Sequence, residues 1–392
     1  MSELIKTDVI IVGAGLVGAS LALALKEARV SVVLIETKPP APAPQDDSWD
    51  NRVYAINPGS EHFLRELGVW QMLDESRCAP IEAMEVWGDD SEAEIDFTAQ
   101  DANQTSLGHI VENRQLQNVL WHTLQHQSHV RVISPAQCVS LVLSDNQSKL
   151  ILADGTEIHA SLIVGADGAD SWVREQAGME SSGKSYNQSG VVANFFCESP
   201  HGNIARQWFD GSSVLAWLPM QGNHISMVWS LPLQQAHELM QCDETTLCEK
   251  VAEAGHHGLG KLELITPPAS FPLRLLQVKQ QVKPNVALVG DAAHAVHPLA
   301  GQGVNLGFQD VRVLAQVLQG RAEHQSCGDY HLLRRFERAR KEDILAMQWT
   351  TDGLQQLFSL QNGLAKTIRN KGLALTNRQG WLKRQLIRHA VR

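Results

Sequence analysis

The first 36 residues alternate between short apolar runs and polar breaks. Residues 9–25 carry no charged side chain, and three glycines interrupt this run, namely Gly13, Gly15 and Gly18. A short apolar run that ends at a glycine turn is typical of a buried strand. The pattern therefore predicts one βαβ unit, made of a strand over 8–12, a helix over 16–27 and a strand over 31–36.

Similar patterns recur along the chain. The spacing of Phe63, Leu64, Leu67 and Val69 predicts a helix over 58–73. Alternating runs on both sides of Asp154-Gly155 predict a hairpin. Further helices are predicted over 113–126, 304–318 and 330–392, and further strands over 130–134, 162–164 and 286–289.

Residues 190–231 have a different character. Four aromatic-rich runs, VVANFF, RQWF, SVLAWLPM and HISMVWSL, are separated by Gly, Asn, Pro and Ser. Such short runs predict a separate antiparallel sheet rather than more βαβ units. The sequence thus predicts an α/β fold with an inserted antiparallel sheet and a helical C-terminal region.

Composition excludes several classes of protein. With 392 residues, 43% of them hydrophobic and 19% charged, the chain is typical of a globular protein with more than one core. A net charge of −10 argues against general affinity for nucleic acids. The six cysteines show no CxxC or Cys/His ligand spacing, so we expect reduced thiols, a cytoplasmic location and no metal site.

The run over 9–25 is not expected to be a targeting or membrane segment. It is shorter than the roughly 20 apolar residues that cross a bilayer, and acidic Glu3 and Asp8 precede it.

The end of the chain is basic. After Asp352 no acidic residue occurs, and eight basic residues form what we call the basic tail: Lys366, Arg369, Lys371, Arg378, Lys383, Arg384, Arg388 and Arg392. Three interpretations stay open: a solvated helical face, a site for anionic lipid, and a docking surface for partner proteins.

The segment Gly13-Ala14-Gly15-Leu16-Val17-Gly18 lies where a dinucleotide fingerprint must lie, between a first strand and its helix. We expect Gly13 to allow the tight turn, Gly15 to admit a pyrophosphate and Gly18 to permit close helix–strand packing. The helix would offer free N–H groups and a positive dipole end to the phosphates. Glu36, at the end of the second strand, is placed to bind an adenosine ribose, which favours FAD or NAD over NADP.

Two later motifs narrow the choice. Residues 165–174 read GADGADSWVR, and residues 290–298 begin Gly290-Asp291-Ala292-Ala293-His294 and end at Pro298. Following the glycine fingerprint in this order, they resemble the Asp-Gly and Gly-Asp motifs of FAD-dependent aromatic hydroxylases of the para-hydroxybenzoate hydroxylase type. The resemblance implies FAD, a Rossmann-like FAD-binding domain and an inserted substrate domain. The boundaries we predict are 1–75, 106–180 and 276–330 for FAD binding, 76–105 and 181–275 for the substrate domain, and 331–392 for the C-terminal helices.

The Gly-Asp motif also makes physical sense beside a flavin. Asp291 follows a predicted parallel strand, where its carboxylate accepts a hydrogen bond from a ribityl hydroxyl. Residues 300–305 would offer N–H groups at a helix start, which stabilise negative charge on a reduced flavin. We therefore expect flavin positioning by Pro298, Gly301, Gln302 and Gly303, and cofactor contacts by Ala14, Val17, Gly290, Val304 and Asn305. His297 is expected to act by its position, with acid–base work less favoured.

Three other residues belong to motifs that the resemblance covers. It implies that Arg52, in NRVYA, lies near the flavin phosphates. Arg114, in VENRQL, either contacts FAD or solvates a helix end. Asp167 either spans the pyrophosphate region and the nicotinamide donor, as the family implies, or mainly holds the local turn.

Within this family the chain resembles the ubiquinone-biosynthesis monooxygenases of the UbiH, UbiF and UbiI group. The resemblance rests on HPLAGQGVNLG at 297–307, RVYAI at 52–56, LGVW at 67–70 and LKRQ at 382–385. It implies insertion of one oxygen atom from O2 into the ring of a polyprenylated phenol through a flavin C4a-hydroperoxide, with NAD(P)H as electron donor. It also favours the basic tail as a contact to the inner membrane or to other ubiquinone-biosynthesis proteins.

Two rival functions remain. A flavin monooxygenase of a soluble phenol would use a dedicated Arg or Tyr on the inserted sheet, where Arg206 and Tyr186 are the candidates. A non-catalytic subunit of a biosynthetic complex would not need the intact glycines and both Asp motifs. The aromatic residues of the sheet either line a hydrophobic pocket or form the core, and the candidates are Trp208, Phe209, Trp217 and Trp229.

Overall fold

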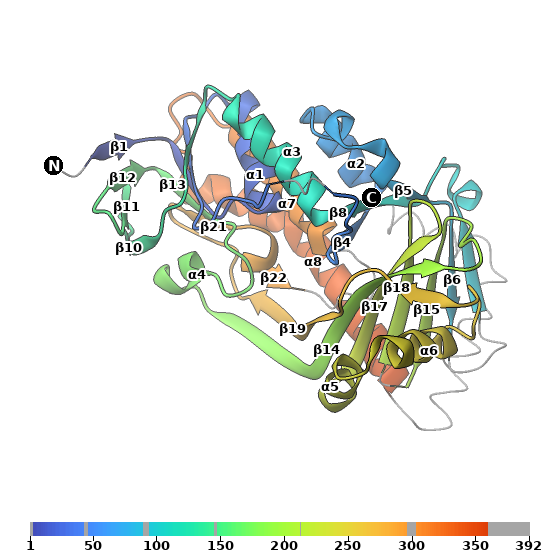
Figure 1. The fold of residues 1–392 in the computed structure, drawn as a ribbon. Helices are drawn as coiled ribbons and strands as arrows, with labels where there is room; N and C mark the ends of the chain where they lie inside the picture. The colour runs from blue at the N-terminus through green and yellow to red at the C-terminus, as the bar shows by residue number, and fades with distance from the viewer. Residues whose placement is uncertain are drawn as a thin grey trace.

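The structure is a computed structural model that describes residues 3–42, 46–88, 94–144, 147–211, 213–295 and 303–359. Its first large sheet has six strands: β2 (Val9–Val12), β3 (Val32–Ile35), β9 (Val130–Ile133), β13 (Leu162–Gly165), β20 (Val282–Lys283) and β21 (Val286–Leu288). Their order is β20-β21-β13-β2-β3-β9, and all neighbours are parallel except β20 and β21. Three separated stretches of the chain thus meet in one sheet, which confirms the predicted α/β fold class (Figure 1).

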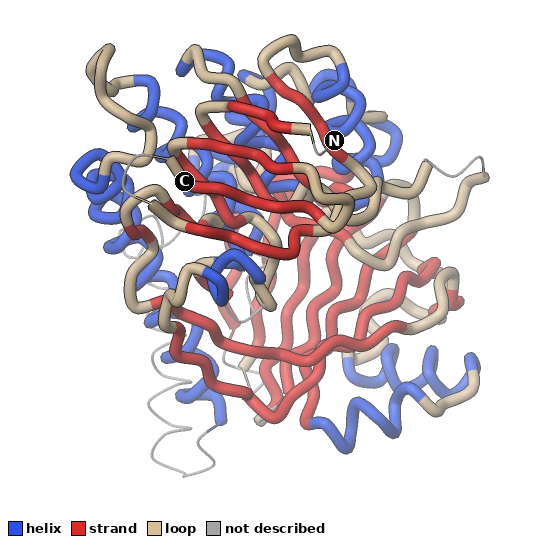
Figure 2. Tube along the Cα trace, turned by 90° about the vertical axis from the view of Figure 1, so that its left-hand side faces the viewer, coloured by secondary structure: helices blue, strands red, loops and turns tan. Residues whose placement is uncertain are grey.

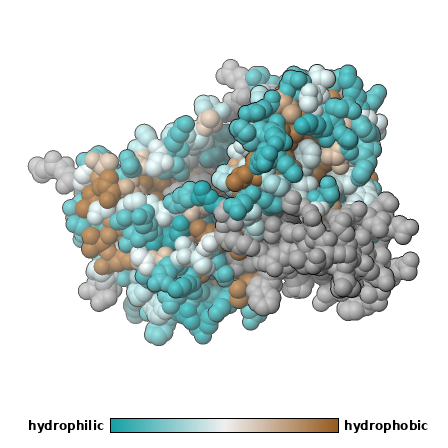
Figure 3. All heavy atoms as spheres, turned by 90° about the horizontal axis from the view of Figure 1, so that it is seen from below, coloured by the Kyte–Doolittle hydropathy of each residue, from teal (hydrophilic) through white to brown (hydrophobic). Residues whose placement is uncertain are grey.

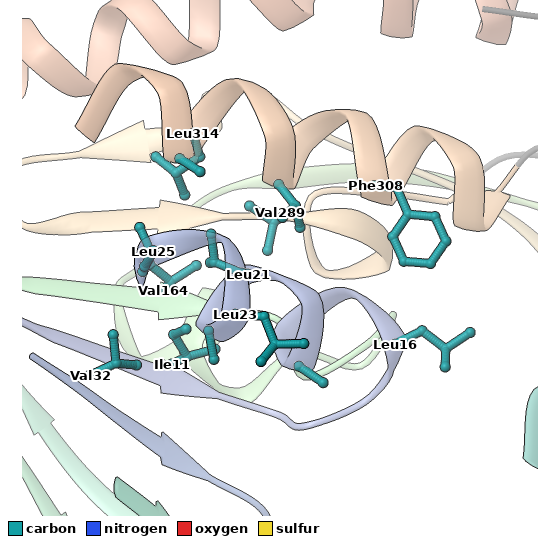
Figure 4. Close-up of a cluster of buried hydrophobic side chains, with 14 of the residues drawn as sticks. Ile11, Leu16, Leu21, Leu23, Leu25, Val32, Val164, Val289, Phe308 and Leu314 are labelled. Atoms are coloured by element: carbon teal, nitrogen blue, oxygen red, sulfur yellow. The ribbon is translucent and has the colours of Figure 1, made fainter. Parts of the chain in front are cut away.

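Helices cover one face of this sheet. They are α1 (Leu16–Ala24), α3 (Asn113–Gln125), α7 (Gly303–Gln319) and α8 (Tyr330–Ser359). Because side chains alternate along a strand, Val164 and Ile11 point toward these helices. Figure 4 shows Leu21 of α1 and Leu314 of α7 in the same cluster as Val164 and Ile11.

A smaller sheet covers the opposite face. It consists of β1 (Leu4–Lys6), β10 (Cys138–Val142), β11 (Ser148–Leu152) and β12 (Glu157–Ala160). Strands β11 and β12 are antiparallel neighbours, which confirms the hairpin predicted at Asp154-Gly155. Helix α4 (Trp172–Gln176) adds Val173 to this second core, which includes Ile10 and Ile163 of the six-stranded sheet.

Two predicted helices end earlier than expected. Helix α2 (Pro58–Glu66) stops before Gly68, whose φ of +72° allows the chain to turn, and a 3-10 turn over Trp70–Met72 follows. Helix α1 likewise passes into a 3-10 turn over Leu25–Ala28. The apolar spacing continues beyond both ends because Leu25, Val69 and Trp70, in or beside these turns, are also buried.

The second large sheet has nine strands (Figure 2). They are β6 (Ala83–Trp87), β7 (Glu94–Thr98), β14 (Ser181–Cys197), β15 (Ile204–Asp210), β16 (Ser213–Met220), β17 (His224–Pro232), β18 (Leu262–Leu264), β19 (Ala269–Val278) and β22 (His294–Ala295). The order is β22-β19-β14-β17-β16-β15-β6-β7, with β18 paired to β14. Residues 190–231 form antiparallel pairs as predicted, whereas β15 and β6 are parallel.

Different elements cover the two faces of this sheet. Helices α5 (Leu233–Met240) and α6 (Glu244–Ala254) pack on one face, over Val191, Ala193 and Phe195. On the other face lies a three-stranded sheet of β4 (Val53–Ile56), β5 (Ala79–Ile81) and β8 (Gly108–Glu112). It contacts Ala205 and Leu218. The domain boundaries given above stay a prediction.

The described surface is mainly hydrophilic on the side that Figure 3 shows, with a group of hydrophobic residues at the left end. Exposed large hydrophobic residues include Leu4, Val139 and Val142, all from the smaller four-stranded sheet. None of the helices in the described ranges combines the length and apolar character that crossing a bilayer requires.

Candidate cofactor and active site

Close backbone contacts hold the loop after β2. Gly13 has a φ of +100°, and a Cβ built on Gly18 would lie 1.9 Å from the carbonyl oxygen of Gly13. Only glycine fits at Gly18, because α1 approaches the loop so closely. At Gly15 a Cβ would meet no protein atom within 4 Å, and no side chain caps the helix that starts there. The loop therefore leaves open space and a free helix N-terminus, which fit the diphosphate of FAD.

Glu36 contacts the loop after β2. The Oε2 atom of Glu36 accepts a hydrogen bond of 2.6 Å from the backbone N–H of Ala14. Its carboxylate therefore lies beside the glycine loop, as ribose binding requires.

The methyl groups of Val17 are the nearest atoms to a Cβ built on Gly290 (3.2 Å) or on Gly307 (2.6 Å). Val17 thus joins the first motif to the Gly-Asp turn and to α7.

Asp167 holds its own turn. Its carboxylate accepts hydrogen bonds from the Ser171 hydroxyl at 2.5 Å and from the backbone N–H of Val173 at 3.0 Å. Arg174, at the end of the same motif, donates to the carbonyl oxygens of Ala169 (2.8 Å) and Ala292 (3.0 Å). The structure therefore shows the turn-holding interpretation directly, and Arg174 ties the Asp-Gly motif to the Gly-Asp turn. A contact of Asp167 with the cofactor stays a prediction.

Beneath the Gly-Asp turn lies a carboxylate that the sequence analysis did not single out. Asp310 of α7 is fully buried, and its Oδ2 accepts a 2.9 Å hydrogen bond from the backbone N–H of Gly290. The same oxygen lies 2.6 Å from Nε2 of His294, and Oδ1 accepts a 2.8 Å hydrogen bond from Nε of Arg340. Burial by itself raises the pKa of Asp310, but His294 and Arg340 outweigh it and hold that pKa below its usual value. We call these four residues the Asp310 network.

Asp291 has the opposite environment. Its side chain reaches solvent, yet enough protein surrounds it that desolvation raises its pKa. The positive charges of His294 and Arg52 act against this rise. The guanidinium of Arg52 lies 5.3 Å from the ring centre of Tyr54. The structure thus brings Arg52 and Asp291 within electrostatic reach of each other, as a shared flavin site requires.

Arg114 is engaged in local contacts. Its side chain donates to the Ser48 hydroxyl at 3.1 Å and lies 3.2 Å from the carboxylate of Glu112, and its backbone N–H donates to Asp50. Glu112 in turn accepts from the backbone N–H of Asp50 at 2.6 Å and pairs with Arg77. Arg114 therefore helps to shape the chain before β4, and its contact with FAD stays a prediction.

The start of α7 is tied to β4. The side chain of Asn305 donates to the carbonyl oxygen of Ala55 at 2.8 Å and accepts from the backbone N–H of Asn57 at 3.1 Å. Val304 is buried in the core, and a Cβ built on Gly303 would meet no atom within 4 Å. The side chains of Val304 and Asn305 thus position the helix, which leaves backbone groups for a cofactor. His297, Pro298, Gly301 and Gln302 lie outside the described residues.

The aromatic residues of the nine-stranded sheet separate by face. Trp208 and Trp217 are buried in the cluster under α5 and α6, and Trp229 packs against it. Phe209 lies on the other side, with Val214 and Val86. The core interpretation is therefore confirmed for Trp208 and Trp217.

The face of this sheet away from α5 and α6 carries two polar residues that the sequence did not reveal. Asn194 of β14 and Ser226 of β17 are directly paired and fully buried. Among the described residues, Oδ1 of Asn194 and Oγ of Ser226 have no hydrogen-bond partner. The amide nitrogen of Asn194 donates to the carbonyl oxygen of Asp50 at 2.9 Å. This places the pair beside the segment that leads to Arg52.

Comparison with known proteins agrees with this geometry. The model of the family described as "FAD binding domain" matches residues 6–342. The 3-demethoxyubiquinol 3-hydroxylase of Escherichia coli (strain K12) is 36% identical over 388 residues, with 98% of each chain covered. The ubiquinone hydroxylase UbiL of Rhodospirillum rubrum is 35% identical over 386 residues, which cover 98% of this chain and 89% of the relative.

A solved structure shares the fold. The p-nitrophenol 4-monooxygenase PnpA from Pseudomonas putida DLL-E4 aligns with a TM-score of 0.77 at 17% identity, with 99% of each chain covered. The predictions of FAD as cofactor and of aromatic-ring monooxygenation are confirmed. The chain belongs to the FAD binding domain family, in the group of FAD-dependent aromatic monooxygenases that includes the hydroxylases of ubiquinone biosynthesis.

Proposed function

We propose that this enzyme hydroxylates the aromatic ring of a polyprenylated phenol, with O2 and NAD(P)H as co-substrates. The observation that carries the proposal is the chemistry of the sheet face that holds Asn194 and Ser226. By strand register this face also holds Val192, Val228, Ala216, Leu218, Gln207 and Ala205. None of these residues is charged, and Val192, Val228 and Ala216 are only partly buried. Small, uncharged side chains suit a neutral ring with an apolar substituent.

Among the described residues of this face named above, none carries a positive charge that would bind the carboxylate of the rival substrate, a soluble phenol. Arg206 is paired with Trp217 in the sheet register and so points to the side of α5 and α6. Its Nε lies 3.0 Å from a carboxylate oxygen of Glu85, and Nη1 donates to the carbonyl oxygen of His201 at 3.1 Å. Arg206 is thus already engaged, which weighs against that rival.

FAD, when bound, supplies the activation of O2 that the hydroxylation needs. The residues of this chain bind and orient. Gly13, Gly15 and Gly18 with the start of α1 would hold the phosphates, Glu36 the ribose, and Asp291 a ribityl hydroxyl. Asn194 would accept a hydrogen bond from the ring hydroxyl, and Ser226 would donate one to a ring oxygen. Such placement fixes which ring carbon faces the flavin, and the reaction then needs no nucleophilic side chain.

The basic tail is proposed to hold the enzyme at an anionic surface, either the inner membrane or a partner protein of the same pathway. A membrane-borne substrate supports this, since clustered Lys and Arg bind anionic headgroups. The tail lies outside the described residues. Charge reversal of Lys383, Arg384 and Arg388 is expected to lower the membrane-bound fraction, and unchanged fractionation would count against a lipid contact.

The quinone profile of source cells that lack this protein tests the function. Mass spectrometry is expected to show a prenylphenol that is short of one ring oxygen, and its structure identifies the carbon that is hydroxylated. Restoration by the wild-type gene, but not by Gly18→Ala, ties the defect to FAD binding. An unchanged ubiquinone pool in cells without a redundant relative would contradict the proposal.

A further inference from the structure

The Asp310 network joins α8 to the turn that carries Asp291. We propose that Asp310 and Arg340 are positioning residues for FAD, in which Arg340 supplies the permanent charge that lets Asp310 hold the turn over 290–294. The inference rests on the proposed contact between Asp291 and the cofactor. It concerns residues of α7 and α8 that lie outside the three sequence motifs.

One carboxylate holds both ends of the turn. Asp310 accepts from the backbone N–H of Gly290 at 2.9 Å and contacts Nε2 of His294 at 2.6 Å, while Asp291 lies between them. Gly290 has a φ of +59°, a left-handed conformation that glycine adopts without strain, so hydrogen bonds and not backbone restriction hold the turn in place. The direction of the Asp291 carboxylate therefore depends on two hydrogen bonds to Asp310.

Burial makes the charge of this carboxylate costly. Asp310 is 0% exposed and Arg340 is 1% exposed. A carboxylate in such surroundings stays ionised only when a cation and hydrogen bonds compensate it. Arg340 gives this compensation at every physiological pH, because a guanidinium does not lose its proton.

Without Arg340, His294 would be the remaining cationic partner. Among the described residues, His294 faces the carboxylates of Asp310 from α7 and Asp291 from its own turn, while Arg340 from α8 pairs with Asp310 and Arg52 acts on Asp291. On β19, the strand paired with β22, the register partner of His294 is the uncharged Gln277. The hold of Asp310 on the turn would then depend on the charge of His294 alone.

The test is the pH dependence of FAD affinity, measured by flavin fluorescence on the apoprotein. In the wild type, the dissociation constant is expected to change less than about twofold between about pH 6 and pH 8. In Arg340→Met it is expected to rise about tenfold over this range, because Asp310 then depends on a histidine, the side chain whose charge changes with pH near neutrality. The sign follows from linkage: FAD binds better to the protonated form, so affinity is lost as the pH rises.

Matched variants separate this role from a structural one. Arg334→Met removes an arginine of the same helix whose partner is Glu337, and it is expected to keep the wild-type profile. Asp310→Asn combined with Arg340→Met removes both charges and should abolish the pH dependence. If Arg340→Met does not fold, Arg340→Gln removes the charge and keeps a hydrogen-bond donor.

Two outcomes would overturn the inference. Affinity that is unchanged in both neutral variants, or weakened equally at all pH values, means that Arg340 only stabilises the fold. Asp291→Ala gives the separate check on the placement of FAD. If Asp291→Ala leaves the dissociation constant unchanged, the proposed contact fails. If it weakens binding while Arg340→Met shows no pH dependence, only the network inference fails.

Discussion

The two large sheets present their functional groups in different ways. In the six-stranded sheet, Gly13, Asp167 and Gly290 follow the ends of three neighbouring parallel strands, so that they meet at one edge. In the nine-stranded sheet, Asn194 and Ser226 lie side by side on a face. Residues at the edge act through backbone N–H groups and close backbone approaches. Residues on the face act through the side chains that point to that face, because side chains alternate along a strand. The two regions should therefore respond differently to substitution.

The largest effect is expected from substitutions at Trp217 and Ala216, which are neighbours in the nine-stranded sheet with side chains on opposite faces. Trp217→Ala should lower the free energy of unfolding by about 3–5 kcal/mol, because the buried indole leaves a cavity under α5 and α6. Ala216→Leu should leave stability nearly unchanged and raise the KM for the substrate. Denaturant unfolding and steady-state kinetics measure the two. If Trp217→Ala and Ala216→Leu raised the KM equally, the two faces of the sheet would not differ in substrate binding.

The glycine loop gives the second comparison. Gly18→Ala should weaken FAD binding about a hundredfold, about 2.7 kcal/mol, because α1 must move away from the carbonyl oxygen of Gly13. Gly15→Ala meets no protein atom, so it should leave the melting temperature of the apoprotein unchanged and weaken FAD binding about tenfold. Fluorescence titration and thermal unfolding separate the two. A fall in apoprotein stability with Gly15→Ala would contradict the open space at that position.

These two regions differ in how far the sequence predicts them. The glycines leave a readable pattern because other residues are excluded, either by a positive φ or because a Cβ would lie only 1.9 Å from a carbonyl oxygen. The faces of the nine-stranded sheet follow from alternation, but nothing local shows which face α5 and α6 cover. The pocket role considered for Trp208 and Trp217 was wrong for that reason.

The Asp310 network shows a further limit. Asp310 stands within the predicted helix over 304–318, and its partner Arg340 is thirty residues away on α8. Such a pair depends on helix packing and leaves no local spacing to read. The one available signal was an acidic residue on the apolar side of a helix, beside Phe308 and Val311. The early end of α2 was missed because the apolar spacing continues across Gly68.

The smallest effect is expected from a surface ion pair that joins the nine-stranded sheet to the loop after β13. Arg274 of β19 pairs with Asp170, at 3.2 Å, but both side chains are largely exposed. Arg274→Gln should change the free energy of unfolding by less than about 1 kcal/mol, because solvent screens the pair. The FAD dissociation constant should stay the same. A larger loss in denaturant unfolding would mean that surface pairs hold the two sheets together.

The most direct test of the central claim is the origin of the oxygen atom in the product. Purified enzyme with FAD, NAD(P)H and a prenylated phenol is supplied with ¹⁸O2, and the product is analysed by mass spectrometry. The account predicts a ring hydroxyl that contains one ¹⁸O atom, and it predicts loss of this product with Gly18→Ala. Oxygen derived from water, or consumption of NAD(P)H with no ring hydroxylation of any prenylphenol tested, would contradict it.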